Sequence, residues 1–179
     1  MLHIYHSPTE SDAKDFSAAQ EEMIANGSVT GESKELINQT IKRVEEVLDE
    51  HFPDYLKYDN GSFAISRGST HVSIIVRHFL KGETIIESTA NVVSGADISQ
   101  KLMNFLLRKN AQLHFGSFAL LFDDTITYSH SISGSNLDSN ELITSLSTVA
   151  FIADYYDDII VENYGGKRSA DIVSEFEAY

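Results

Sequence analysis

The sequence predicts an α+β fold in which a single antiparallel sheet of five strands follows the order α-β-β-β-α-β-β-α. Three segments carry apolar residues at every third or fourth position, which is typical of amphipathic helices. Between these segments, apolar and polar residues alternate in short runs that are joined by short turns. Such runs are typical of antiparallel strands, because short links cannot connect parallel ones.

The composition indicates one domain in water rather than a membrane protein. The chain has 179 residues, of which 42% are hydrophobic, and its formal net charge is −14. The acidity argues against nucleic acid and against an anionic membrane surface as partners, and leaves a basic or neutral partner open. No run approaches the ~20 apolar residues that span a bilayer, and the N-terminus does not resemble a secretory signal. We therefore expect a cytoplasmic protein.

The organisation along the chain predicts one domain with two appendages. Residues 1–32 are expected to be a partly ordered arm, residues 33–166 the α+β domain, and residues 167–179 a tail that is either a short amphipathic segment or a loose end. His3 and His6 lie close together in the arm, but a zinc site needs further ligands. No metal site is expected there.

The first half of the domain predicts one helix and three strands. The helix begins at Ser33 and ends before Pro53, because a proline disfavours helix in the residue before it. Strands are expected at 62–67, 71–79 and 83–93. Arg77 and Glu87 fall on the more polar face, where a cross-strand ion pair is expected.

The second half predicts a short helix, a hairpin and a long helix. The short helix spans about 98–109, with Asn110 as a left-handed cap. The long helix begins at Asp138, which with Glu141 makes a capping arrangement, and ends at Gly165-Gly166. The apolar stripe of the short helix is broad, so this helix is expected to contact more than the sheet.

The hairpin at 113–134 turns at Asp123-Asp124. Its second strand has one apolar face, and its first strand is apolar on both, with Phe118, Leu120 and Phe122 on one of them. A strand that is apolar on both faces needs covering on both. If the first and third helices cover one face of the sheet, then Phe118, Leu120 and Phe122, together with Phe105 on the second helix, are left to form a contact between two copies of the chain.

The sequence contains no catalytic or cofactor signature. There is no cysteine, no phosphate-binding glycine loop, no dinucleotide fingerprint and no nucleophile elbow, so neither catalytic residues nor a cofactor are expected. Four carboxylates, Asp154, Asp157, Asp158 and Glu162, are interpreted as a solvated face of the long helix rather than a metal site. An enzyme built from scattered groups such as His71, His130 and Tyr128 is the least favoured alternative.

The sequence resembles the YbjN-like branch of the type III secretion chaperone-like (CesT/Tir chaperone) superfamily over about residues 33–164. The resemblance is carried by the element order and by four strings: LMNFLLRKN (102–110), FGSFAL (115–120), DDTITY (123–128) and VAFIADYYDD (149–158). It implies a small acidic α+β protein, usually a homodimer, that binds extended segments of partner proteins. It implies no catalytic residues.

The sequence therefore favours a non-enzymatic chaperone or adaptor that acts as a homodimer and binds a segment of an unidentified protein. One alternative remains from the residues themselves: Phe118, Leu120 and Phe122 could line a pocket for an apolar small molecule. The two interpretations differ in what covers these side chains.

Overall fold

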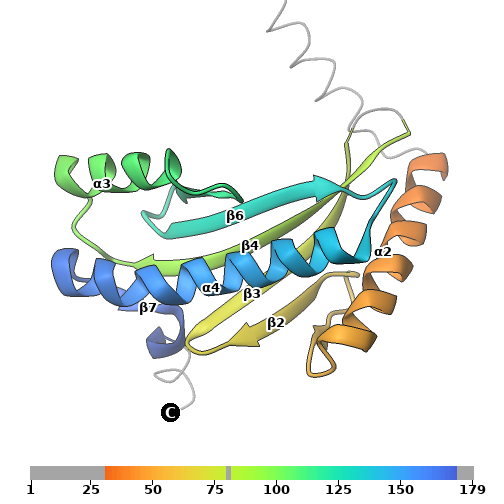
Figure 1. Ribbon diagram of the computed structural model, residues 1–179, viewed down its shortest axis with the longest axis horizontal. Helices are drawn as coiled ribbons and strands as arrows, with labels where there is room; N and C mark the ends of the chain where they lie inside the picture. Colours follow the sequence, from red (N-terminus) through yellow and green to blue (C-terminus); the bar gives the residue numbers. More distant parts are fainter. Residues whose placement is uncertain (1–30, 80–81, 173–179) are drawn as a thin grey trace, which may run out of the picture.

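The computed structural model describes residues 31–79 and 82–172, in which three helices lie against one sheet (Figure 1). The helices are α2 (Gly31–His51), α3 (Gln100–Asn110) and α4 (Ser139–Tyr164). The strands are β1 (Leu56–Lys57), β2 (Phe63–Arg67), β3 (Thr70–His78), β4 (Thr84–Ser94), β5 (Ser117–Leu120), β6 (Ile126–Ser133) and β7 (Lys167–Arg168). All pairings are antiparallel. The sheet order is β1-β2-β3-β4-β6-β5, and β7 pairs with the end of β4.

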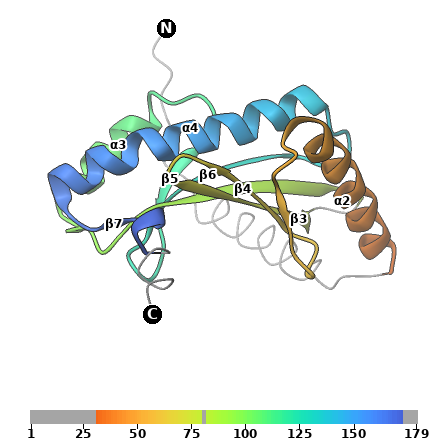
Figure 2. The same cartoon turned by 90° about the horizontal axis from the view of Figure 1, so that it is seen from below.

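The sheet has one face covered by α2 and α4, and none of the helices α2, α3 and α4 covers the other face (Figure 2). Every second residue of a strand is buried and faces the helices, as Val72, Ile74 and Val76 are on β3. The uncovered face is polar, and there the guanidinium of Arg77 donates to the carboxylate of Glu87. The predicted cross-strand ion pair is confirmed.

The helix ends follow the local signals in the sequence. The Asp138 side chain accepts from the backbone N–H groups of Asn140 and Glu141, and this satisfies donors that the first turn of α4 leaves free. Gly165, with φ at 74°, ends α4, and α2 ends two residues before Pro53. None of these helices, within the residues that the structure describes, has the length and apolar composition to cross a membrane.

The α+β class and the antiparallel sheet are confirmed, but the predicted number of strands is wrong. Within residues 31–79 and 82–172 the sheet has seven strands rather than five, and the additional ones, β1 and β7, have two residues each. Two residues are too few to show an alternating pattern, and only their pairing defines them as strands. The first strand of the hairpin is also shorter than the predicted 113–122, because the chain bends at Gly116, where φ is +88°.

The predicted division into arm, domain and tail remains a prediction. Residues 1–30, which include His3 and His6, and residues 173–179 lie outside the described residues. The described part of the tail begins with β7 and a helical stretch at 169–172.

Candidate functional site

Two of the four residues predicted to form an interface are wholly or partly inside the protein. Phe118 is only 6% exposed, and its ring makes edge contacts with Tyr128 and Tyr156. Phe105 is half-buried between α3 and α4, where it meets Tyr156 and Tyr164. The face of β5 that carries Phe118 therefore turns toward the chain's own core.

The other two predicted residues lie on the surface, where α3 and the tip of the hairpin expose further apolar side chains. Leu120 is 42% exposed and Phe122 is fully exposed. Leu121 beside them, and Met103 and Leu107 on α3, are exposed as well. We call these five residues the hairpin surface. Where exposed apolar side chains gather on a soluble protein, they commonly mark a binding surface.

Asn110 fixes α3 against β5 and so builds the hairpin surface. Its side-chain oxygen accepts from the Phe118 N–H at 2.7 Å, and its amide donates to the Phe118 carbonyl at 3.1 Å. The prediction that Asn110 is a left-handed cap is wrong, because Asn110 is the last residue of α3 and Ala111, with φ at −71°, follows in a right-handed conformation. Its amide is occupied by the neighbouring strand instead.

Half of β6 has an open edge. β5 pairs only with Ile126–Ser129, so among the described strands none pairs with His130–Ser133 on the side away from β4. The backbone N–H and C=O of Phe118 bond to the Asn110 side chain and so point away from β6. Tyr128, which lies opposite Phe118 on β6, therefore directs its own N–H and C=O away from β5 and toward β4. Because these directions alternate along an antiparallel strand, the N–H and C=O of Ser131 point outward from the open edge.

A shallow cleft of about 340 Å³ adjoins the open edge and separates it from the start of α4. Phe115, His130 and Ile132 line one part of it, and Glu141 and Thr144 line the other. His130 Nδ1 lies 2.9 Å from the hydroxyl oxygen of Ser145, and burial lowers the pKa of His130 despite the nearby Glu141. The lining of the cleft thus combines the apolar side chains of Phe115 and Ile132 with one carboxylate, that of Glu141.

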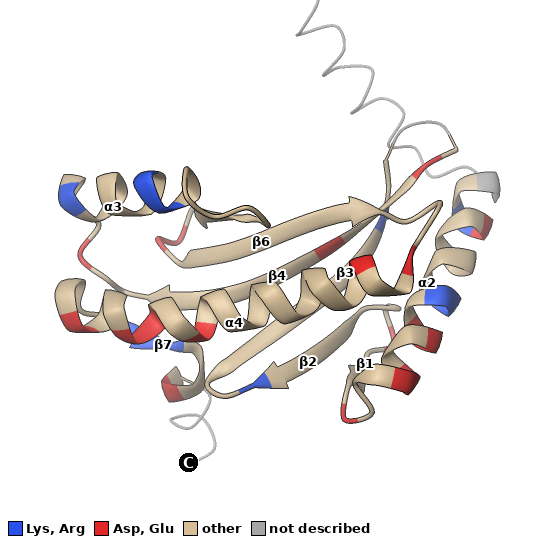
Figure 3. Ribbon diagram, viewed as in Figure 1, with Lys and Arg blue, Asp and Glu red and all other residues tan. Residues whose placement is uncertain are grey.

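Acidic residues lie along α4 (Figure 3), but they do not form the predicted uniform solvated face, because one of them is buried. Asp157 is only 2% exposed and accepts from the Ser69 hydroxyl at 2.6 Å, while Asp154 accepts from the Ser69 N–H at 3.1 Å. Asp158 pairs with Arg168 at 2.9 Å. The prediction is wrong for Asp157 because position 157 falls on the buried stripe of α4. In the described residues, no group of three or more His, Asp or Glu could hold a metal ion.

The groups considered for a scattered active site lie on opposite faces of the sheet. His71 is exposed on the uncovered face, where its Nδ1 meets the Ser66 hydroxyl at 2.9 Å. Tyr128 and His130 face α4, and burial raises the pKa of Tyr128 to about 12. The tyrosine hydroxyl donates to the Phe115 carbonyl. These three groups therefore do not share a cleft.

A protein-family comparison supports the resemblance that the sequence predicts. The profile of the family described as T3SS (YopN, CesT) and YbjN peptide-binding chaperone 1 matches residues 34–172. No curated protein matches the chain.

Comparison with solved structures finds one chain of similar fold and two of lower similarity. The ExsC–ExsE complex contains a chain with a TM-score of 0.52 and 14% identity, and the match covers 67% of this chain and 95% of that one. A chain of the HopA1–SchA chaperone–effector complex has a TM-score of 0.47 and 11% identity, and the match covers 70% of this chain and 92% of that one. A chain of the complex between the Yersinia pestis type III secretion chaperone SycH and a stable fragment of YscM2 has a TM-score of 0.45 and 18% identity, and the match covers 64% of this chain and 96% of that one.

Proposed function

The chain belongs to the T3SS (YopN, CesT) and YbjN peptide-binding chaperone 1 family, and from this premise we propose that it binds an extended segment of a partner protein without catalysing a reaction. The ExsC–ExsE structure, one chain of which has a similar fold, is itself a complex of two proteins. We further propose that the chain acts as a homodimer whose two copies meet at the hairpin surface.

The observation that carries the proposal is the open edge of β6. An extended peptide can add to such an edge as a further strand, and the main-chain hydrogen bonds then supply affinity that does not depend on the peptide's sequence. Ser131 presents an outward N–H and C=O for this pairing. Without a partner, a free edge of this kind is an aggregation hazard that proteins usually block.

The neighbouring cleft supplies selectivity. Side chains alternate along a strand, so a peptide paired with His130–Ser133 directs every second side chain toward α4. There it meets the apolar side chains of Phe115 and Ile132. The segment favoured by this arrangement is extended and carries one apolar residue flanked by polar ones.

The test uses peptides selected on the purified protein. Random 12-residue peptides displayed on phage are enriched on the full chain, and the enriched peptide is labelled and measured by fluorescence anisotropy. Ser131→Pro removes the outward N–H but leaves the pairing with β4, since proline is tolerated where the N–H faces away from the sheet. It is expected to weaken binding about tenfold or more.

Two further variants complete the design. Ser131→Ala keeps the backbone and is expected to bind like the wild type. Thr144→Phe fills the cleft. It is expected to weaken the binding of peptides with a large apolar residue and to leave the stability of the fold unchanged. Failure to enrich any peptide, or enriched peptides that bind Ser131→Pro as tightly as Ser131→Ala, would overturn the proposal.

A further inference from the structure

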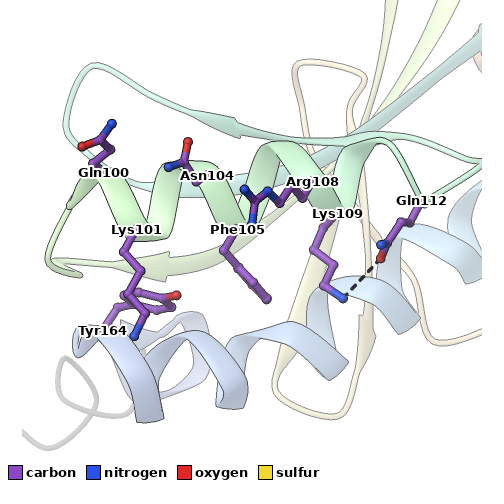
Figure 4. Close-up of a pocket in the computed structure, with 8 residues that line it drawn as sticks. All are labelled: Gln100, Lys101, Asn104, Phe105, Arg108, Lys109, Gln112 and Tyr164. Carbon is purple, nitrogen blue, oxygen red and sulfur yellow. Dashed lines mark hydrogen bonds between the residues drawn. The ribbon is translucent and has the colours of Figure 1, made fainter.

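A second open groove lies between α3 and the C-terminal end of α4, and its chemistry is basic (Figure 4). It has a volume of about 700 Å³. Lys101, Phe105, Arg108 and Lys109 line it from α3, and Tyr164 lines it from α4. Figure 4 shows Lys101, Phe105 and Lys109 directed from α3 toward α4. We call this feature the basic groove.

The charge of the basic groove is opposite to that of the whole chain. It holds three of the chain's 13 Lys and Arg residues, although the formal net charge is −14. No carboxylate lines it, and no described carboxylate forms an ion pair with Lys101, Arg108 or Lys109. Lys57, Arg77 and Arg168, in contrast, are each paired within the chain.

Helix stability accounts for two of the three charges in the basic groove but not for Lys101. Arg108 and Lys109 lie in the last turn of α3, where cations interact favourably with the helix dipole. Lys101 is the second residue of the same helix, and its charge is unfavourable there. The first turn also has no acidic residue to compensate.

Aromatic rings hold the two lysines in place. Lys101 Nζ lies 5.7 Å from the centre of the Tyr164 ring, and Lys109 Nζ lies 5.5 Å from that of Phe105. Lys109 also donates to the side-chain oxygen of Gln112 at 3.4 Å. Cation–π contacts of this kind orient an ammonium group without neutralising it, so both charges stay available to an anion.

We propose that the basic groove binds an acidic segment of a partner protein. Lys101 and Lys109 are eight residues apart on a helix, which corresponds to about 12 Å. An extended peptide covers that distance with about four residues. The matching segment is therefore about four residues long. It has Asp or Glu at each end, to pair with Lys101 and Lys109, and an aromatic residue between them that contacts Phe105.

A nucleic acid fits the basic groove less well than such a peptide. A nucleic acid carries one phosphate per nucleotide along its whole length. The phosphates that extend past the groove would be repelled by the carboxylates of α4. An acidic peptide needs only two or three charges and can be neutral outside the groove. The proposal does not rest on the open edge of β6, which belongs to different residues.

The experiment measures the anisotropy of three labelled peptides, Gly-Glu-Glu-Phe-Glu-Glu-Gly and its counterparts with Gln or Lys in place of Glu, against the full chain. The acidic peptide is expected to bind about tenfold more tightly than the Gln peptide at ~50 mM salt and to lose most of that advantage at ~300 mM. The Lys peptide tests attraction by the net acidity of the chain.

A pair of double variants separates the groove from the overall charge. Lys101→Glu with Arg108→Glu is expected to abolish the preference for the acidic peptide. Lys34→Glu with Lys42→Glu makes the same charge change on exposed positions of α2 and is expected to preserve it. Ser131→Pro is also expected to preserve it, which separates this proposal from the open edge.

Three results would overturn the proposal. They are equal binding of the acidic and Gln peptides, an equal loss in both double variants, and displacement of the acidic peptide by a 15-nucleotide oligo-dT at comparable concentration.

Discussion

Asp157 is a carboxylate that the fold buries between α4 and the turn after β2. Burial raises its pKa above the usual 3.8, and the hydrogen bonds from Ser69 and the Asp158 N–H offset this only in part. Because its folded pKa is raised, the contribution of Asp157 to stability is fully present below the unfolded pKa and is lost as the pH rises through the folded value. The raised pKa of Asp157 therefore lowers the free energy of unfolding at neutral pH.

Asp157→Asn is accordingly expected to stabilise the protein at pH 7. The amide keeps an oxygen for the Asp158 N–H and can donate to the Ser69 hydroxyl, whose hydrogen still reaches Asp154. The melting temperature should rise by about 2–4 °C, the shift that about 1 kcal/mol produces in a chain of this size. Thermal unfolding followed by circular dichroism from pH 7 to pH 3.5 should show the gain shrinking as the pH falls.

Asp59→Asn provides the matched control for that measurement. Asp59 is exposed, so its substitution makes the same change in net charge without relieving a buried carboxylate. If Asp157→Asn lowers the melting temperature at pH 7, or if Asp59→Asn raises it equally, burial of Asp157 is not the cause of the effect.

At the scale of elements, β5 depends on α3 as well as on β6. It is a four-residue edge strand, and the outer backbone groups of Phe118 bond to the Asn110 side chain instead of a further strand. Gly116 lets the chain approach β6 closely, since a Cβ there would lie 2.5 Å from the Ser129 carbonyl oxygen. A short strand with one paired edge would otherwise fray.

Asn110→Ala is expected to release β5. It leaves the part-buried N–H and C=O of Phe118 without their partners, which costs about 1–3 kcal/mol. Amide hydrogen exchange should accelerate at 117–120 while the protection of β3 and β4 stays as in the wild type. Asn110→Asp retains the acceptor and should have a smaller effect; unchanged exchange at 117–120 in the Ala variant would contradict this role.

The long elements could be predicted because their periodicity records burial. The apolar stripe of α4 and the alternation along β3 each specify a structure and a buried face. The hairpin was harder, because β5 is apolar on both faces and alternation does not say which face the helices cover. Phe118 was therefore predicted on the surface although it is in the core. The hydrogen bonds of Asn110 and Asp157 could not be predicted, because their partners, Phe118 and Ser69, are supplied by the tertiary fold.

At the scale of the whole molecule, the hairpin surface and the open edge of β6 lie apart. The hairpin surface is at the tip of the hairpin and on α3, whereas the open edge of β6 begins at His130, where β5 no longer covers it. In Figure 1, α3 and the end of β6 lie toward opposite ends of the sheet. A two-fold contact through the hairpin surface would therefore leave both open edges free, and a dimer should bind two peptides.

The last prediction tests this arrangement through the oligomeric state. Light scattering coupled to size exclusion should give the wild type about twice the mass of one chain. Leu120→Asp and Phe122→Asp should each shift it to the monomer, because a buried unpaired carboxylate opposes association. Phe151→Asp is the control, since Phe151 is a 50%-exposed aromatic on α4 outside the hairpin surface, and this variant should remain a dimer.

A peptide selected on the wild type should bind the Phe122→Asp monomer one to one with unchanged affinity, because the open edge and its cleft belong to a single chain. A wild type that is monomeric at tens of micromolar would contradict self-association through the hairpin surface, whereas a monomeric variant that loses the peptide would show that the binding site is shared between two copies.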